Sequence, residues 1–149
     1  MDRRKAREEA LGLIFESEFQ ALNTKEEIIE LATDARELEN DEYMREVFYA
    51  SMEHREEIDA LISKYAVGWS LKRVSKVALA VMRLSIAEML YMEDIPFQVS
   101  INEALELIKR YDHDVPPKFV NGVLNAVAQG VGLKGKVLSE EPAADQAEV

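Results

Sequence analysis

The chain has 149 residues, a formal net charge of −11 and no cysteine, so we expect a single domain, undivided or built of two small lobes, with no disulfide and no thiolate chemistry. Its apolar runs are shorter than the roughly 18 residues of a membrane span and its first residues are charged, so we expect a cytoplasmic protein without a signal peptide or membrane contact. P-loop, nucleophile-elbow and dinucleotide motifs are absent and the two histidines are not at metal-ligand spacing, so we expect no catalysis, cofactor or metal site.

Helix is the only secondary structure that the sequence predicts, because proline is absent from the first 95 residues, glycine is scarce and no strand pattern occurs. Thr24 and Glu27 match a capping box, in which each side chain satisfies a backbone N–H at the start of a helix. Asn40 or Asp41 is expected to cap the next helix, which bends near His54. The helices predicted in the first half span about residues 2–21, 24–38 and 41–65.

Four basic side chains occupy the first two turns of the first predicted helix: Arg3, Arg4, Lys5 and Arg7. Cations at a helix N-terminus oppose the helix macrodipole, at a cost of about 0.3–1 kcal/mol each when exposed. A helix built for stability alone would carry Asp and Glu there. Two interpretations stay open: ordinary surface charge with arginines lying along apolar surface, or a patch that contacts phosphates, which a guanidinium binds bidentately.

The negative charge is concentrated in one segment. Residues 16–62 carry 4 basic and 15 acidic side chains, whereas residues 63–139 carry 10 basic and 7 acidic ones. The overall charge opposes nucleic-acid binding, but the second segment is mildly basic. We interpret the acidic segment as a solvated face that could also repel RNA from the wrong side of the molecule.

A helix expected from Ser70 to about Met92 is apolar on nearly all sides, so we predict that it forms the buried axis of the fold. Gly68 is the stop signal that precedes it. Arg83 within this helix is predicted to be structural, paired with Glu88 or with a carboxylate of the N-terminal lobe.

Two further helices follow, joined by a proline-containing turn. Ser100 and Glu103 match a capping box for the first of them, and Pro117 is pre-set for the first turn of the second. The last helix segregates its side chains into an apolar face and a polar stripe. The predicted inward positions are Val120, Val123, Leu124 and Val127, and the polar stripe contains Lys118, Asn121, Gly122 and Asn125.

Phe119 lies off the inward face of the last predicted helix, next to Lys118. Two interpretations stay open: Phe119 fills a gap between helices, or it stacks on a base of single-stranded RNA, which is worth roughly 1–3 kcal/mol per base. Gly122 costs about 1 kcal/mol relative to alanine inside a helix. With Asn121 it serves either the polar stripe or close helix packing.

Three segments resemble the NusB family of bacterial transcription antitermination factors. Ile101-Asn-Glu-Ala with Lys118-Phe-Val-Asn-Gly-Val-Leu resembles the family's C-terminal signature. Arg3-Arg-Lys-Ala-Arg-Glu resembles its arginine-rich first helix, and Trp69-Ser-Leu with Arg83-Leu-Ser-Ile-Ala-Glu resembles its central helix. The resemblance extends from about residue 3 to residue 128. Val115-Pro-Pro departs from the more polar residues common in the family.

The resemblance implies an all-α, NusB-like fold of about seven helices in two small bundles that share a core, spanning residues 1–129. It implies a factor that binds the single-stranded boxA element of rRNA leader transcripts with a small-subunit ribosomal protein, called NusE in this role, and acts with RNA polymerase and other Nus factors. Some relatives form a homodimer through the first helix, which would hide the RNA surface. The RNA-binding residues that we predict are Arg3, Arg4, Arg7, Phe15, Lys118, Phe119, Asn121 and Asn125.

Two other functions stay open. A helical protein-interaction module without RNA binding agrees with the net charge of −11. The second is an accessory domain related to that of RNA cytosine methyltransferases. A complete enzyme of that kind is excluded because the chain has no cysteine nucleophile. The glycine-containing, acidic segment of residues 130–149 is predicted to be a disordered tail.

Overall fold

The computed structural model describes residues 1–132, so the predicted tail lies, from residue 133 onward, outside the described residues. Within them the chain is all-α, with the seven helices that the resemblance implies. None of these helices is both long and apolar enough to cross a membrane. The helices are α1 (Arg3–Ser17), α2 (Lys25–Arg36), α3 (Glu42–Glu53), α4 (Arg55–Tyr65), α5 (Lys76–Tyr91), α6 (Phe97–Tyr111) and α7 (Pro117–Gly130).

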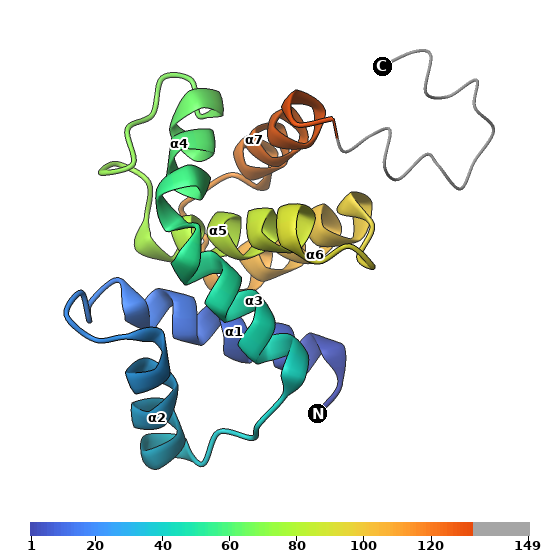
Figure 1. Cartoon of the computed structure of the whole chain (residues 1–149). Helices are drawn as coiled ribbons and strands as arrows, with labels where there is room; N and C mark the ends of the chain where they lie inside the picture. Colours follow the sequence, from blue (N-terminus) through green and yellow to red (C-terminus); the bar gives the residue numbers. More distant parts are fainter. Residues whose placement is uncertain (133–149) are drawn as a thin grey trace.

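Two groups of helices meet at α5 (Figure 1). α1, α2 and α3 form the lower group of the view, and α4, α6 and α7 lie around α5 in the upper group. α5 contacts both groups, because it packs on α1 and α3 as well as on α4, α6 and α7. Every residue from Ala78 to Met89 is buried. The prediction of a buried central axis is therefore confirmed, and α5 supplies the core that the two groups share.

Local signals place several helix ends as predicted. Thr24 and Glu27 make both hydrogen bonds of the capping box at the start of α2. The Asp41 side chain accepts a hydrogen bond from the backbone N–H of Met44 at 2.8 Å and so caps α3. His54 leaves the helical region of backbone conformation, so the predicted bend separates α3 from α4.

Two of the predicted helix boundaries are wrong. α1 ends at Ser17 rather than near Ala21 and is followed by turn hydrogen bonds. α5 begins at Lys76, because Ser75 rather than Ser70 is its cap: the Ser75 hydroxyl accepts from the backbone N–H of Ala78 at 3.0 Å. Residues 66–75 consequently form a loop between α4 and α5.

The predicted capping box at Ser100 is also wrong. α6 begins at Phe97, directly after Pro96, so Ser100 and Glu103 lie inside the helix. Ser100 is buried and donates a hydrogen bond to Glu88 of α5 at 2.7 Å. The spacing of a capping box equals the i, i+3 spacing of one helix face, and here that face carries contacts to other helices.

Arg83 is structural, as predicted, and of the two predicted kinds of partner it takes a carboxylate of the N-terminal lobe, Glu18, rather than Glu88. Its guanidinium donates to both carboxylate oxygens of Asp59 on α4 at 2.8 Å and to Glu18, just after α1, at 2.6 Å. Burial disfavours the charge of Arg83, yet the hydrogen bonds that it donates to these two carboxylates, together with their charge, raise its pKa overall. This cluster ties the end of α1 to α4 and α5.

α7 follows the predicted segregation. Pro117 is its first residue, and the four predicted inward positions are all buried. Gly122 is exposed, and a Cβ added there would meet no atom within 4 Å. Close packing therefore does not require glycine at this position, and Gly122 belongs to the polar stripe.

Candidate nucleic-acid interface

A buried hydrogen-bond cluster lies beneath the basic start of α1. Arg7 is only 4% exposed, and its Nε donates to Glu88 of α5 at 2.6 Å. The hydroxyl of Tyr43 donates to the same carboxylate oxygen, and Ser100 donates to the other one. A second nitrogen of Arg7 donates to Glu103 at 3.3 Å. The cluster thereby joins α1, α3, α5 and α6.

The charges of this cluster stabilise one another. Burial disfavours the guanidinium of Arg7, but the hydrogen bond and charge of Glu88 outweigh it and raise the pKa of Arg7. Burial and the neighbouring Glu88 carboxylate raise the pKa of Tyr43. The prediction that Arg7 contacts RNA phosphates is therefore corrected, because freeing it would leave Glu88 as an uncompensated buried charge. Arg7 positions the start of α1 instead.

Arg3 and Arg4 remain available at the surface. The Arg3 guanidinium lies 4.2 Å from the centroid of the Tyr43 ring, in a cation–π arrangement. The Arg4 side chain is 75% exposed and donates a single hydrogen bond to Glu103 at 3.3 Å. Both guanidiniums thus keep donors that face solvent and that a phosphate could accept.

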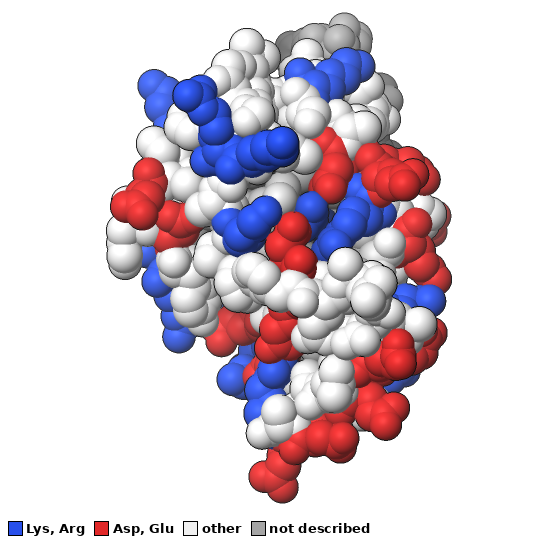
Figure 2. Space-filling model, turned by 90° about the vertical axis from the view of Figure 1, so that its left-hand side faces the viewer, with Lys and Arg blue, Asp and Glu red and all other residues white. Residues whose placement is uncertain are grey.

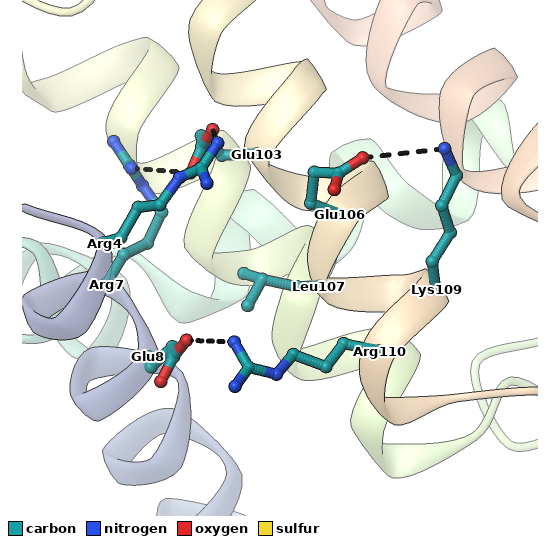
Figure 3. A pocket seen from close by; sticks show the side chains of 8 residues that line it. All are labelled: Arg4, Arg7, Glu8, Glu103, Glu106, Leu107, Lys109 and Arg110. Atoms are coloured by element: carbon teal, nitrogen blue, oxygen red, sulfur yellow. Dashed lines mark hydrogen bonds and ion pairs between the residues drawn. The ribbon is translucent and has the colours of Figure 1, made fainter.

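A groove between α1 and α6 begins at Arg4 (Figure 3). It encloses about 250 Å³ and is lined by charged side chains of both signs. Glu8 of α1 pairs with Arg110 of α6 at 2.5 Å, and Glu106 pairs with Lys109 at 3.6 Å. Arg110 and Lys109 therefore have carboxylate partners, as Arg4 has in Glu103, and the groove carries mixed charge.

An apolar hollow continues this groove toward the end of α1. It encloses about 320 Å³, and its wall is formed by Glu8, Leu11, Gly12, Phe15, Val77 and Tyr111. Phe15 is partly buried there and packs edge-on against Phe19, which is 64% exposed. The predicted RNA-binding residue Phe15 therefore lies among apolar side chains.

The predicted residues of α7 form a second group. Lys118 and Asn121 are exposed, and the amide of Asn125 donates to the side chain of Asn121 at 2.9 Å. Phe119 is half-buried, and its ring centroid lies 5.0 Å from that of Trp69 in the α4–α5 loop. Trp69 did not figure among the predicted site residues, although a large aromatic residue close to a lysine and an arginine was a signal for it.

α1 and α6 run side by side in the same direction, because Arg4 pairs with Glu103 and Glu8 pairs with Arg110. The groove and the apolar hollow are lined by residues of α1, α5 and α6, and none of the predicted RNA-binding residues of α7 is among these lining residues. Arg3 and Arg4 lie at the start of the groove. Tyr111 lines the hollow and is followed by the short connection to α7.

A model of the NusB family matches residues 4–129. The chain belongs to the NusB family. Transcription antitermination protein NusB of Bacillus pumilus is 43% identical over 127 residues, which cover 85% of this chain and 95% of that protein. Its counterpart from Bacillus subtilis is 41% identical over 131 residues, which cover 88% and 98%. The family membership predicted from the sequence motifs is thus confirmed.

Solved structures of the family share the fold. NusB of Thermotoga maritima superposes with a TM-score of 0.73 at 36% identity, covering 87% of this chain and 92% of that one. A structure of the antitermination factors NusB and NusE in complex with double-stranded RNA matches with a TM-score of 0.73 at 25% identity, covering 87% and 99%. The predicted NusB-like architecture is confirmed as well.

Proposed function

We propose that this protein is a transcription antitermination factor that binds the boxA element of nascent rRNA leader transcripts together with NusE. It would deliver both to RNA polymerase with the other Nus factors, in the cytoplasm. The relatives of this chain are named transcription antitermination proteins, and one solved neighbour contains NusB, NusE and RNA. The protein acts by binding, and no step of this function requires catalysis.

The observation that carries the RNA-binding part of this proposal is the exposed pair Arg3 and Arg4 at the start of α1. The pair is kept at the surface against the helix macrodipole, while Arg7 beneath it is held by Glu88. Contacts to phosphates fix the register of a bound strand without reading its sequence. Lys118, Asn121 and Asn125 on α7 supply the polar groups that could reach base edges.

The apolar hollow around Phe15 suits a protein partner better than a phosphate chain. Its wall is mainly apolar, and the neighbouring Phe19 is largely exposed. Aromatic side chains of this kind anchor protein interfaces. We therefore assign Phe15 to the NusE contact rather than to the predicted RNA contact. A second copy of this chain could cover the same surface, and such a homodimer would compete with NusE.

Fluorescence anisotropy tests the proposal. Labelled single-stranded boxA RNA and a scrambled oligonucleotide of equal length are titrated with the protein in the presence of NusE. We expect tighter binding of boxA, and weaker binding of both RNAs by the double variant Arg3→Ala/Arg4→Ala. Arg45→Ala is the matched control. It also removes an arginine, but one that lies in the acidic segment of residues 16–62 and is hydrogen-bonded to Asn40. If wild-type protein binds neither RNA, the alternative of a protein-interaction module replaces this proposal.

A further inference from the structure

The loop between α4 and α5 displays two apolar side chains that the described contacts leave uncovered. Trp69 is 44% exposed and Val67 is 85% exposed. Phe119 of α7 lies against Trp69, with ring planes inclined by 42°. Because Phe119 itself packs on the core, it supports Trp69 from the protein side and leaves the other side of the indole open to solvent.

The loop is held in place although it has no regular secondary structure. Its ends are anchored by Ala66 and Val74, which are 2% and 3% exposed. The backbone N–H of Trp69 donates to the carbonyl of Ala66 at 3.0 Å, which closes a tight turn. The hydroxyl of Ser75 donates to Asp112, just after α6. The indole is therefore presented on a pre-formed support, which reduces the entropy cost of binding a partner.

The charge around Trp69 favours a nucleic acid over a basic or neutral protein. Residues 60–87 contain no aspartate or glutamate, in a chain whose net charge is −11. Their basic side chains are the exposed Lys64, Lys72 and Arg73, Lys76, which pairs with Glu18, and the buried Arg83. Lys72 and Arg73 are exposed within four residues of Trp69, and Lys118 is exposed next to Phe119. In Figure 2, in which the side of the molecule that carries this loop faces the viewer, the upper part carries several basic side chains with acidic ones between them, and acidic side chains are more abundant toward the bottom.

We propose that Trp69, supported by Phe119, stacks on an unpaired base of the bound RNA. The phosphates on either side of this base lie against Lys72 and Arg73 in the loop and against Lys118 on α7. An aromatic face flanked by cations is the usual arrangement for single-stranded nucleic acid, because every base has a π-face and every linkage a phosphate. This inference rests on the proposed RNA-binding function and assigns the stacking contact to the α4–α5 loop.

The chain contains a single tryptophan, so its fluorescence reports on this site alone. We expect single-stranded boxA RNA, added in the presence of NusE, to quench the emission of Trp69 in a saturable manner. An abasic ribose-phosphate oligomer of equal length is the matched ligand, since it offers the same phosphates without a base to stack. We expect it to bind with little quenching.

Substitution separates the stacking role from a structural one. Trp69→Leu should weaken boxA binding by about 5- to 150-fold, whereas Trp69→Phe should retain most of the affinity. Thermal melts by circular dichroism check that both variants stay folded. If a variant does not fold, the fluorescence of the wild-type protein still tests the stacking contact. Val67→Ala is the control for loss of exposed apolar surface in the same loop, and we expect it to leave RNA affinity unchanged.

Four results would overturn the inference. Wild-type protein that binds boxA without a change in tryptophan emission, and equal affinity of Trp69→Leu for boxA, would each refute the stacking contact while the proposed function stands. Loss of NusE binding by Trp69→Leu, with RNA affinity unchanged, would assign the indole to a protein interface. Failure of the wild-type protein to bind any RNA would refute the proposed function itself and the inference with it.

Discussion

Replacing Glu88 by alanine should destabilise the fold more than any change to a surface charge. Glu88 is 1% exposed and accepts hydrogen bonds from Arg7, Tyr43 and Ser100. Its removal leaves these donors without their acceptor and leaves the guanidinium of Arg7 buried, with only the contact to Glu103 at 3.3 Å.

Breaking a buried ion pair by removing one partner typically costs about 3–5 kcal/mol. Domains of this size are stable by roughly 5–15 kcal/mol, so Glu88→Ala should remove at least about a fifth of the free energy of unfolding. The exposed pair of Glu8 and Arg110 offers the comparison. Its side chains are 23% and 62% exposed, and Glu8→Ala should cost no more than about 1 kcal/mol.

Urea denaturation followed by circular dichroism measures both losses. The double variant Arg7→Met/Glu88→Met should recover much of the stability lost by Glu88→Ala, because two apolar side chains of similar size leave no unpaired charge. A loss below about 1 kcal/mol for Glu88→Ala would contradict the structure's placement of a buried charge cluster between α1 and α5.

Three further outcomes follow from the same contacts. Arg3→Ala/Arg4→Ala should flatten the slope of log K against log salt for single-stranded RNA by about 1.4, since each lost phosphate contact contributes about 0.7, and Arg7→Met should leave the slope unchanged; an unchanged slope in the double variant would exclude these phosphate contacts. Burial acts to raise the pKa of Glu18, but the hydrogen bond and charge of Arg83 outweigh it and lower the pKa below its ordinary value of 4.5. The stability that Glu18 contributes is therefore present above about pH 4.5 and is lost as the pH falls through the lowered pKa; urea melts of Glu18→Gln should show a weaker acid dependence, and an identical one would contradict the pairing. Phe119→Ala should cost less than the 3–5 kcal/mol typical of a fully buried phenylalanine, because Phe119 is half-buried, and a larger loss in urea melts would place it in the core.

Periodic and local signals were sufficient for much of the fold. The apolar run of α5 and the four inward positions of α7 follow from hydrophobic spacing, which depends only on the helix itself. The capping box of Thr24 and Glu27 is equally local. In contrast, Ser70 and Ser75 offer the same cap chemistry, and the hydrogen bond of Ser75 to Asp112, 37 residues away, favours the second serine.

The candidate site depended more on contacts between distant segments. Arg7 cannot be distinguished from Arg4 by sequence, because both lie in the basic start of α1. Its burial follows from Glu88, 81 residues further along the chain. The proposed role of Trp69 likewise depends on Phe119, which lies 50 positions later and supports the indole because the packing of α7 brings it there. Such pairings arise from the tertiary fold, which a local pattern does not encode.

The measurement that tests the account most directly is the coupling between RNA and NusE on this protein. Isothermal titration calorimetry gives the affinity for single-stranded boxA RNA without NusE and with NusE saturating, and then the affinity for NusE without and with RNA. We predict weak RNA binding by the protein alone and a gain of about 1–3 kcal/mol in the presence of the other ligand, equal in both directions. Equal RNA affinity with and without NusE, or no RNA binding in either case, would contradict the account.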